Sequence, residues 1–344
     1  MIKADVPVTV GNFPFIPSRT PPSLEQIQGG SWKGLALGLA LLTLTACAGE
    51  AAPVPEEEPA EAPVGAVAAT PPGQDIWLAR LARGTDGRLV VADPANVTSR
   101  AGYDNQPYFL PDGSAFWYTV IDDAGQADIW LYDMAAKTTR PVTTSAPESE
   151  YSATPLPGGG GFSAIRVEAD STQRLWRFDL DGGDAEVIFP GIAPVGYHAW
   201  GSGQSAAMFV LGDPATLQVA RPGAPDAVTV ARDVGRSLQS IPGSGDVSYV
   251  QRHPDGTTEI RRLNLDSGTS ELIVAGVEGE DFHSWTPDGV LLQAHEGRVF
   301  SFVPGVDTAW TQIADLSPLR IRLSRMAVHP DGTWIALVGE APGG

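Results

Sequence analysis

Two histidines occupy the same position in separate parts of the chain. His198 lies two residues before Trp200, and His283 lies two residues before Trp285. Neutral imidazoles are common metal ligands, and Asp281 would add a carboxylate beside them. One hypothesis is therefore a metal-dependent hydrolase or lyase that acts through His198, His283 and Asp281.

The equivalent positions elsewhere in the chain weaken this hypothesis. The chain contains recurrent turns, and the positions that match the two histidines can be found by counting back from each turn. These positions hold Pro107, Ala153, Leu238 and Met326. Two imidazoles among four apolar residues make a poor ring of metal ligands. For the two histidines, the favoured role is ordinary polar lining of a central channel. Recognition of a ligand is the second choice, and metal catalysis is the third. We therefore expect no cofactor, although whether the channel holds a metal stays open.

Other polar side chains should gather at the mouth of the same channel. The predicted binding residues are Asn105, Gln106, Tyr197, His198, Gln239, Asp281, His283 and Arg325, with Glu150 and Arg236 as further rim positions. These are the positions where the repeated units of the chain differ, so any function is expected there.

A repeated unit positions these residues. The best copy runs from Asn105 to Val142 and contains four short apolar or alternating runs separated by turn formers, including Pro111-Asp112-Gly113. Equivalent turns follow at intervals of 41–46 residues. Their first landmarks are Pro111, Pro157, Gly201, Pro242, Pro287 and Pro330.

The third run of each unit gives an independent count with the same period. Its second residues are Ile129, Leu175, Leu217, Ile260 and Val299, spaced 39–46 residues apart. A further third run, Asp75–Arg80, comes first in the chain and is followed by a fourth run, residues 89–92. The last unit has only its first two runs at the C-terminus, so the two ends should share one unit.

This arrangement predicts an all-β, six-bladed β-propeller over residues 74–342, closed by strands from both termini. Radial repetition with a shared unit leaves only short, protected strand edges. The recurrent aromatic residues are more simply explained by packing between blades than by glycan stacking. They are Trp77, Trp117, Trp130, Trp176, Phe300 and Trp334.

The unit resembles the WD40-like repeats called PD40, as found in the TolB propeller. Residues 106–113 (QPYFLPDG) and 128–133 (DIWLYD) match this pattern best, and the similarity covers about residues 74–340. It implies a binding or scaffolding role in the cell envelope. TolB carries an additional α/β domain before its propeller that has no counterpart here, so the Tol–Pal partnership is not transferred.

The N-terminal part has the pattern of an export signal. Lys33 precedes a 13-residue apolar run that ends at Cys47, the only cysteine of the chain, and Leu44–Cys47 resembles the bacterial lipobox. The resemblance implies a lipid anchor on Cys47 and a signal region over residues 1–46, whose start is expected to lie too far upstream. Residues 47–73 would form an Ala/Pro/Glu-rich tether. With Ala48 after the cysteine, the anchor is expected in the outer membrane, facing the periplasm.

The composition of the chain restricts the kinds of partner and site that can be expected. The formal charge of −19 disfavours nucleic acid, and the single cysteine excludes a disulfide within the chain and a cysteine-rich zinc site. No G-x-S-x-G sequence is present. We therefore expect a monomeric, non-enzymatic scaffold that binds an envelope protein or glycan.

Overall fold

The computed structural model describes residues 73–224 and 226–340, which belong to one compact unit. These residues form 24 β-strands and two short 3-10 helices, Ser202–Gln204 and Ser317–Leu319. Within them no helix has the length and hydrophobicity needed to cross a membrane. The predicted signal region, Cys47 and most of the tether lie outside the described residues.

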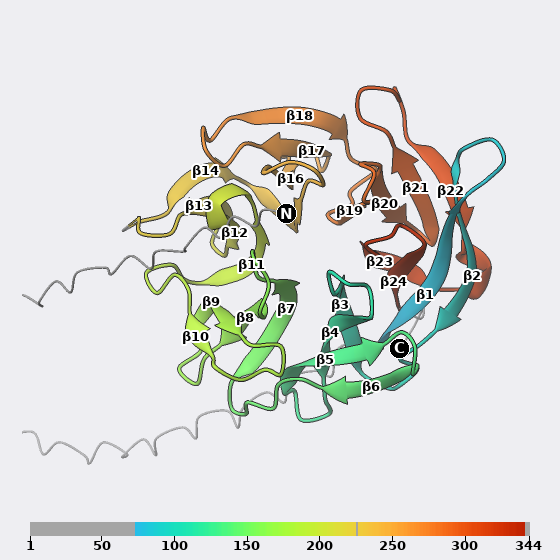
Figure 1. Cartoon of the computed structure of the whole chain (residues 1–344). Helices are drawn as coiled ribbons and strands as arrows, with labels where there is room; N and C mark the ends of the chain where they lie inside the picture. The colour runs from blue at the N-terminus through green and yellow to red at the C-terminus, as the bar shows by residue number, and fades with distance from the viewer. Residues whose placement is uncertain (1–72, 225, 341–344) are drawn as a thin grey trace, which may run out of the picture. The chain divides into compact units, whose positions relative to one another are not determined.

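Four sheets consist of four consecutive antiparallel strands each, which is the unit expected from the repeat. In Figure 1 the sheets are arranged around a common centre. The first comprises β7 (Ser149–Pro155), β8 (Phe162–Val167), β9 (Gln173–Phe178) and β10 (Glu186–Val187). The second comprises β11 (Val195–Trp200), β12 (Ala206–Val210), β13 (Thr216–Ala220) and β14 (Val228–Arg232). The third comprises β15 (Val234–Ser240), β16 (Val247–Arg252), β17 (Thr258–Leu263) and β18 (Ser270–Ala275). The fourth comprises β19 (His283–Trp285), β20 (Leu291–His295), β21 (Arg298–Phe302) and β22 (Thr311–Asp315).

The fifth sheet has eight strands and contains both ends of the described chain. Its members are β1 (Gln74–Arg83), β2 (Leu89–Asn96), β3 (Tyr103–Phe109), β4 (Ala115–Ile121), β5 (Ala127–Asp133), β6 (Thr138–Pro141), β23 (Arg322–Val328) and β24 (Trp334–Glu340). Strands β1 and β24 pair antiparallel over seven residue pairs, from Gln74↔Glu340 to Arg80↔Trp334. A single parallel pair, Gln74↔Tyr103, joins β1 to β3. The expected pairing between N-terminal and C-terminal strands is therefore present.

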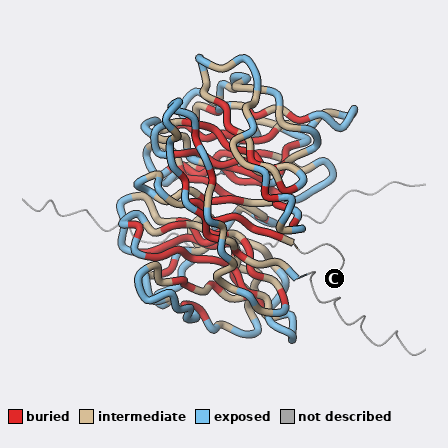
Figure 2. The backbone as a smooth tube through the Cα atoms, turned by 90° about the vertical axis from the view of Figure 1, so that its right-hand side faces the viewer, coloured by how far each residue is buried: buried red, intermediate tan, exposed pale blue. Residues whose placement is uncertain are grey.

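The residues that mark the repeat in the second count are all completely buried. Ile129, Leu175, Leu217, Ile260 and Val299 are 0% exposed. They lie in β5, β9, β13, β17 and β21, each the third strand of its set. Figure 2 shows buried backbone through the middle of the unit and exposed backbone at its outer turns. The period in the sequence thus identifies one buried position in each set.

The Pro-Asp-Gly sequences form tight turns. Gly113, Gly289 and Gly332 have φ values of 71°, 84° and 74°, a region that side-chain-bearing residues avoid. Their amides donate to the carbonyl oxygens three residues earlier at 2.9, 2.9 and 2.8 Å. These recurrent signals in the sequence therefore set the turns, and none of their residues lines the central or entrance cavity.

The recurrent aromatic residues differ in how deeply they are buried. Trp117 is 1% exposed and packs against Phe162 of β8, with ring centroids 5.1 Å apart. Trp130 is only partly buried and packs at the edge of a core cluster. Trp130 therefore packs against the core as expected, but at its edge, whereas Ile129 and Leu131 on the other face of β5 are buried in a second cluster.

Candidate functional site

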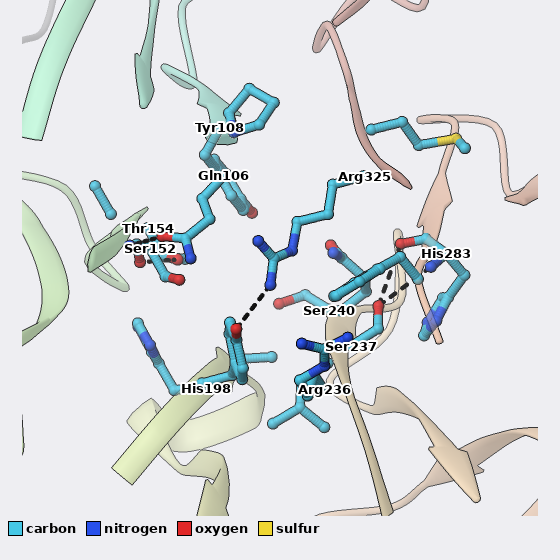
Figure 3. Close-up of a pocket in the computed structure, with 18 residues that line it drawn as sticks. Gln106, Tyr108, Ser152, Thr154, His198, Arg236, Ser237, Ser240, His283 and Arg325 are labelled. Carbon is cyan, nitrogen blue, oxygen red and sulfur yellow. Dashed lines mark hydrogen bonds between the residues drawn. The ribbon is translucent and has the colours of Figure 1, made fainter. Parts of the chain in front are cut away.

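A narrow central cavity of about 80 Å³ lies among β3, β7, β11, β15, β19 and β23, each of which is the first strand of one repeated set. Three wider cavities share lining residues with it, and two of them contain further predicted site residues or turn prolines. The entrance cavity, of about 510 Å³, is lined by Gln74, Asn105, Asp281 and Arg322 among others, which lie at or near the beginnings of β1, β3, β19 and β23. The turn-side cavity, of about 350 Å³, is lined by Gln239 and by the prolines of the turns. Figure 3 shows the central cavity with its side chains.

Irregular backbone brings these side chains to the cavity. Five first strands, all except β19, shift once in register where they pair with the second strand, for example between Asn105 and Tyr108 and between Tyr151 and Thr154. Within these two shifts Gln106 and Ser152 have φ values of 60° and 57°. Such bulges change the direction of a side chain relative to a regular strand. Gln106 accepts hydrogen bonds from Thr119 Oγ1 and Ser152 N, both at 2.8 Å.

Arg325 extends from β23 to the opposite side of the channel. Its Nη2 donates to the Tyr197 hydroxyl at 2.7 Å, and its Nη1 donates to Asn105 Oδ1 at 3.1 Å. Figure 3 shows the bond to Tyr197. The guanidinium carbon lies 4.2 Å from the Phe282 ring centroid. Arg325 lines both the central and the entrance cavities, so it marks the junction between them.

Asp281 is surrounded by arginine side chains at the entrance. Its Oδ1 accepts from Arg252 Nε at 2.8 Å, and its Oδ2 is bonded to Arg252 Nη2 and lies 3.3 Å from Arg236 Nε. The bond to Asp281 raises the pKa of Arg252 above its usual value. Both oxygens of this carboxylate therefore already have cationic partners.

The two histidines make identical contacts with a neighbouring sheet. His198 Nε2 lies 2.7 Å from Ser163 Oγ in β8, which also accepts from Trp200 Nε1 at 2.9 Å. His283 Nε2 lies 2.7 Å from Ser248 Oγ in β16, which accepts from Trp285 Nε1 at 2.8 Å. We call each group a Ser–His–Trp triplet. Burial lowers the pKa of both histidines to about 3, so both imidazoles are neutral.

The tautomer follows from the serine's other bond. Ser163 Oγ lies 3.2 Å from the Thr154 carbonyl oxygen, and Ser248 Oγ lies 3.3 Å from that of Gln239. If each hydroxyl donates to the carbonyl, it accepts from both the indole and the imidazole, and every polar hydrogen in the triplet is used. The proton is then on Nε2, and Nδ1 carries a lone pair that is buried without a partner among the described residues.

Serine and histidine occur together in these sheets. By strand register, the positions equivalent to Ser163 and Ser248 hold apolar residues in the other sets: Trp117, Ala207, Leu292 and Ala336. The histidine positions of the sets that follow these are likewise apolar: Ala153, Leu238, Met326 and Pro107. An imidazole appears only where the preceding sheet supplies its hydroxyl, which indicates a structural role in joining neighbouring sheets.

This pairing predicts the effect of removing one hydroxyl. Ser248→Ala leaves two buried N–H groups without an acceptor and should lower the free energy of unfolding by about 1–3 kcal/mol. Adding His283→Leu reproduces the Ala207/Leu238 combination of another pair of sheets. The double variant should be less destabilised than the sum of the two single changes, as measured by urea unfolding. Simple additivity would contradict the coupling.

All eight predicted binding residues line these cavities, while their role in binding stays a prediction. Gln106, His198 and His283 line the central cavity, Gln239 lines the central and turn-side cavities, and Asn105 and Asp281 line the entrance. Tyr197 and Arg325 line both the central and entrance cavities. Of the further rim positions, Arg236 also lines the central and entrance cavities. The other, Glu150, is instead fully buried, with Ser145 Oγ 2.6 Å from Oε1 and Arg166 Nε 3.3 Å from it.

Two residues that line the cavities were not identified from the repeat in the sequence. Arg252 comes from the end of β16, a second strand, so counting along the first strands does not find it. Phe282 lies between Asp281 and His283 and could have been found by its position. Among residues 73–224 and 226–340, no group of three or more His, Cys, Asp and Glu side chains is placed to hold a metal ion.

No protein-family model matches the sequence, and no curated protein is detectably similar to it. Solved structures are similar in fold. TolB from Acinetobacter baumannii aligns with a TM-score of 0.51 and 12% identity over 78% of this chain and 65% of its own, which is less than two thirds of its length.

Two further structures align over almost their whole length. A TolB candidate from Agrobacterium tumefaciens has a TM-score of 0.58 and 13% identity, over 78% of this chain and 99% of its own. A gluconolactonase candidate has a TM-score of 0.55 and 14% identity, over 76% of this chain and 97% of its own. Identities this low show the fold alone. In its fold, the chain is a TolB-like β-propeller.

Proposed function

We propose that this protein is a non-enzymatic, lipid-anchored propeller that binds an envelope protein or glycan at its entrance cavity. The observation that carries the proposal is the entrance itself, where Arg325, Tyr197 and Asn105 from different strand sets meet in one hydrogen-bonded group. Such convergence of polar and aromatic side chains in a concave site is typical of recognition surfaces. The protein acts as a monomer and needs no cofactor.

The proposed architecture is a ring of six blades. The four four-stranded sheets account for four blades, and the eight-stranded sheet divides at the single Gln74↔Tyr103 pair into β3–β6 and β23-β24-β1-β2. The second half combines strands from both ends of the described chain and would close the ring. The lipidation of Cys47, the tether and the outer-membrane location rest on the sequence pattern. The TolB-like fold is in keeping with the cell envelope.

The alternative is a metal-dependent hydrolase or lyase that uses His198, His283 and Asp281. The fold also occurs in a gluconolactonase candidate, so the architecture is compatible with an enzyme. The contacts favour the scaffold, because the two imidazoles bond to serines and Asp281 bonds to arginines. Metal analysis of the purified full chain tests the alternative. Stoichiometric metal that is lost on changing both histidines to leucine would favour the enzyme.

Site-specific photo-crosslinking in intact bacterial envelopes tests the proposed function. A benzoylphenylalanine at Arg322, which is exposed beside the entrance cavity, should form an adduct with an envelope protein or glycan. The matched control is the same group at Pro330, which is exposed beside the turn-side cavity. Adducts from Arg322 alone would support the proposal. Adducts from Pro330 alone, or from neither position, would overturn it.

A further inference from the structure

We propose that Arg325 binds a carboxylate of an acidic peptide segment of a partner protein. This inference rests on the proposed function, since it assigns a ligand class to the same entrance cavity. It goes further in naming the anchoring residue and the charge that the partner must bring.

Arg325 has only neutral partners. Its guanidinium contacts two phenol hydroxyls, one amide oxygen and the faces of two aromatic rings, and no ion pair among the described residues includes it. Burial raises the pKa of Tyr103, so this phenol stays protonated and supplies no negative charge. A partly buried cation without a counter-ion is the group most able to gain from an incoming anion.

The donors of Arg325 are not all used. A guanidinium has five N–H groups. Nη1 donates towards Asn105 Oδ1 and the Tyr103 hydroxyl, at 3.1 and 3.5 Å, and Nη2 donates once to Tyr197. Within the described residues this leaves Nε–H and one N–H of Nη2 without an acceptor. Two donors are what a carboxylate needs for a bidentate bond.

The surrounding charge favours an anion. Four arginines line the entrance cavity against three carboxylates, and the best-placed carboxylate, Asp281, is already paired with two of the arginines. Glu280 is likewise occupied, with its Oε1 2.9 Å from His295 Nδ1. The four arginines are Arg236, Arg252, Arg322 and Arg325.

The geometry favours a peptide over an acidic glycan. The ring of Phe282 is covered by the guanidinium groups of Arg325 and Arg236, with carbon-to-centroid distances of 4.2 and 5.2 Å. Arg325 also lies over Tyr197, at 5.2 Å. These rings are thus not free to stack on a sugar. The entrance cavity has a volume of about 510 Å³, whereas the central cavity, which also contacts Arg325, has a volume of only about 80 Å³. A slender carboxylate side chain therefore fits the junction between the two cavities better than a pyranose ring does.

A model peptide tests the inference with the full chain. Fluorescently labelled hexaglutamate should bind in an anisotropy titration, more weakly as salt is raised, and hexaglutamine should not. Arg325→Gln should weaken binding by about 10- to 100-fold, and Arg325→Lys should weaken it less because charge remains without the planar fork. Arg140→Gln, the same change at an exposed arginine of β6, should leave affinity unchanged.

Several outcomes would overturn the inference. These are equal affinity in Arg325→Gln, absence of hexaglutamate binding, or tighter Arg325-dependent binding of trigalacturonate, which would assign an acidic glycan. Circular dichroism of each variant confirms that it is folded. If the Arg322 crosslink to an envelope partner survives Arg325→Gln, the scaffold function stands and the carboxylate inference fails. If hexaglutamate binds through Arg325 but no crosslink forms, the proposed function fails instead.

Discussion

Truncation of the chain after Ser324 is expected to abolish the cooperative unfolding transition of the propeller. The deletion removes all of β24, which lies between β23 and β1 and pairs with both. Ile335, Ala336, Leu337 and Val338 of this strand are 0% exposed. Without them β1 and β2 lose their connection to the C-terminal strands, and the hydrophobic residues of β1 become exposed to water.

Circular dichroism during urea unfolding measures this effect. The matched control is truncation after Glu340, which removes only residues 341–344 and leaves every strand intact. The control should unfold at the midpoint of the full chain. If the truncation after Ser324 unfolded at that same midpoint, the strands from the two ends would not stabilise one sheet.

Trp117→Ala is expected to lower the free energy of unfolding by about 3–5 kcal/mol. The side chain is 1% exposed and fills the space between β4 and β8, where Ile129, Phe162 and Ala164 surround it. These neighbours belong to two sheets, so the cavity left by the substitution weakens the contact between the sheets as well as the sheet itself.

Trp130→Ala provides the comparison for Trp117→Ala in the same set of strands. Because Trp130 is partly exposed, it loses less buried surface, and its substitution should destabilise the protein clearly less. Guanidinium unfolding of the two variants, monitored by circular dichroism, measures both effects. Equal destabilisation would contradict the assignment of Trp117 to the core between sheets and of Trp130 to its edge.

The strands could be predicted because they depend on local signals. Turn residues such as Pro111-Asp112-Gly113 fix where a strand ends, and the recurrence of sequences like DIWLYD marks the third strand of each set. The third strands begin within one residue of their predicted positions, and their second predicted residues are fully buried. The degree of burial of Trp130 could not be predicted, because both faces of β5 carry large apolar residues and both pack against core clusters.

The sequence predicted which residues surround the channel, but it did not predict which side chains they contact there. Counting from the turns brought Asn105, Tyr197, Asp281 and Arg325 to one channel, where the structure also places them. The partners of each side chain were beyond the sequence. Asp281 was predicted as a rim position, but its pairing with Arg252 of another strand could not be predicted.

By itself the sequence therefore determined the repeat, the strands and the set of residues that surround the channel. Only the tertiary structure decided what these residues do there. It joins His283 to Ser248, 35 residues earlier, and it brings Arg325 to Tyr197 across 128 residues of chain. Such contacts depend on how whole sheets are placed relative to one another, and the periodicity of a single strand carries no information about that placement.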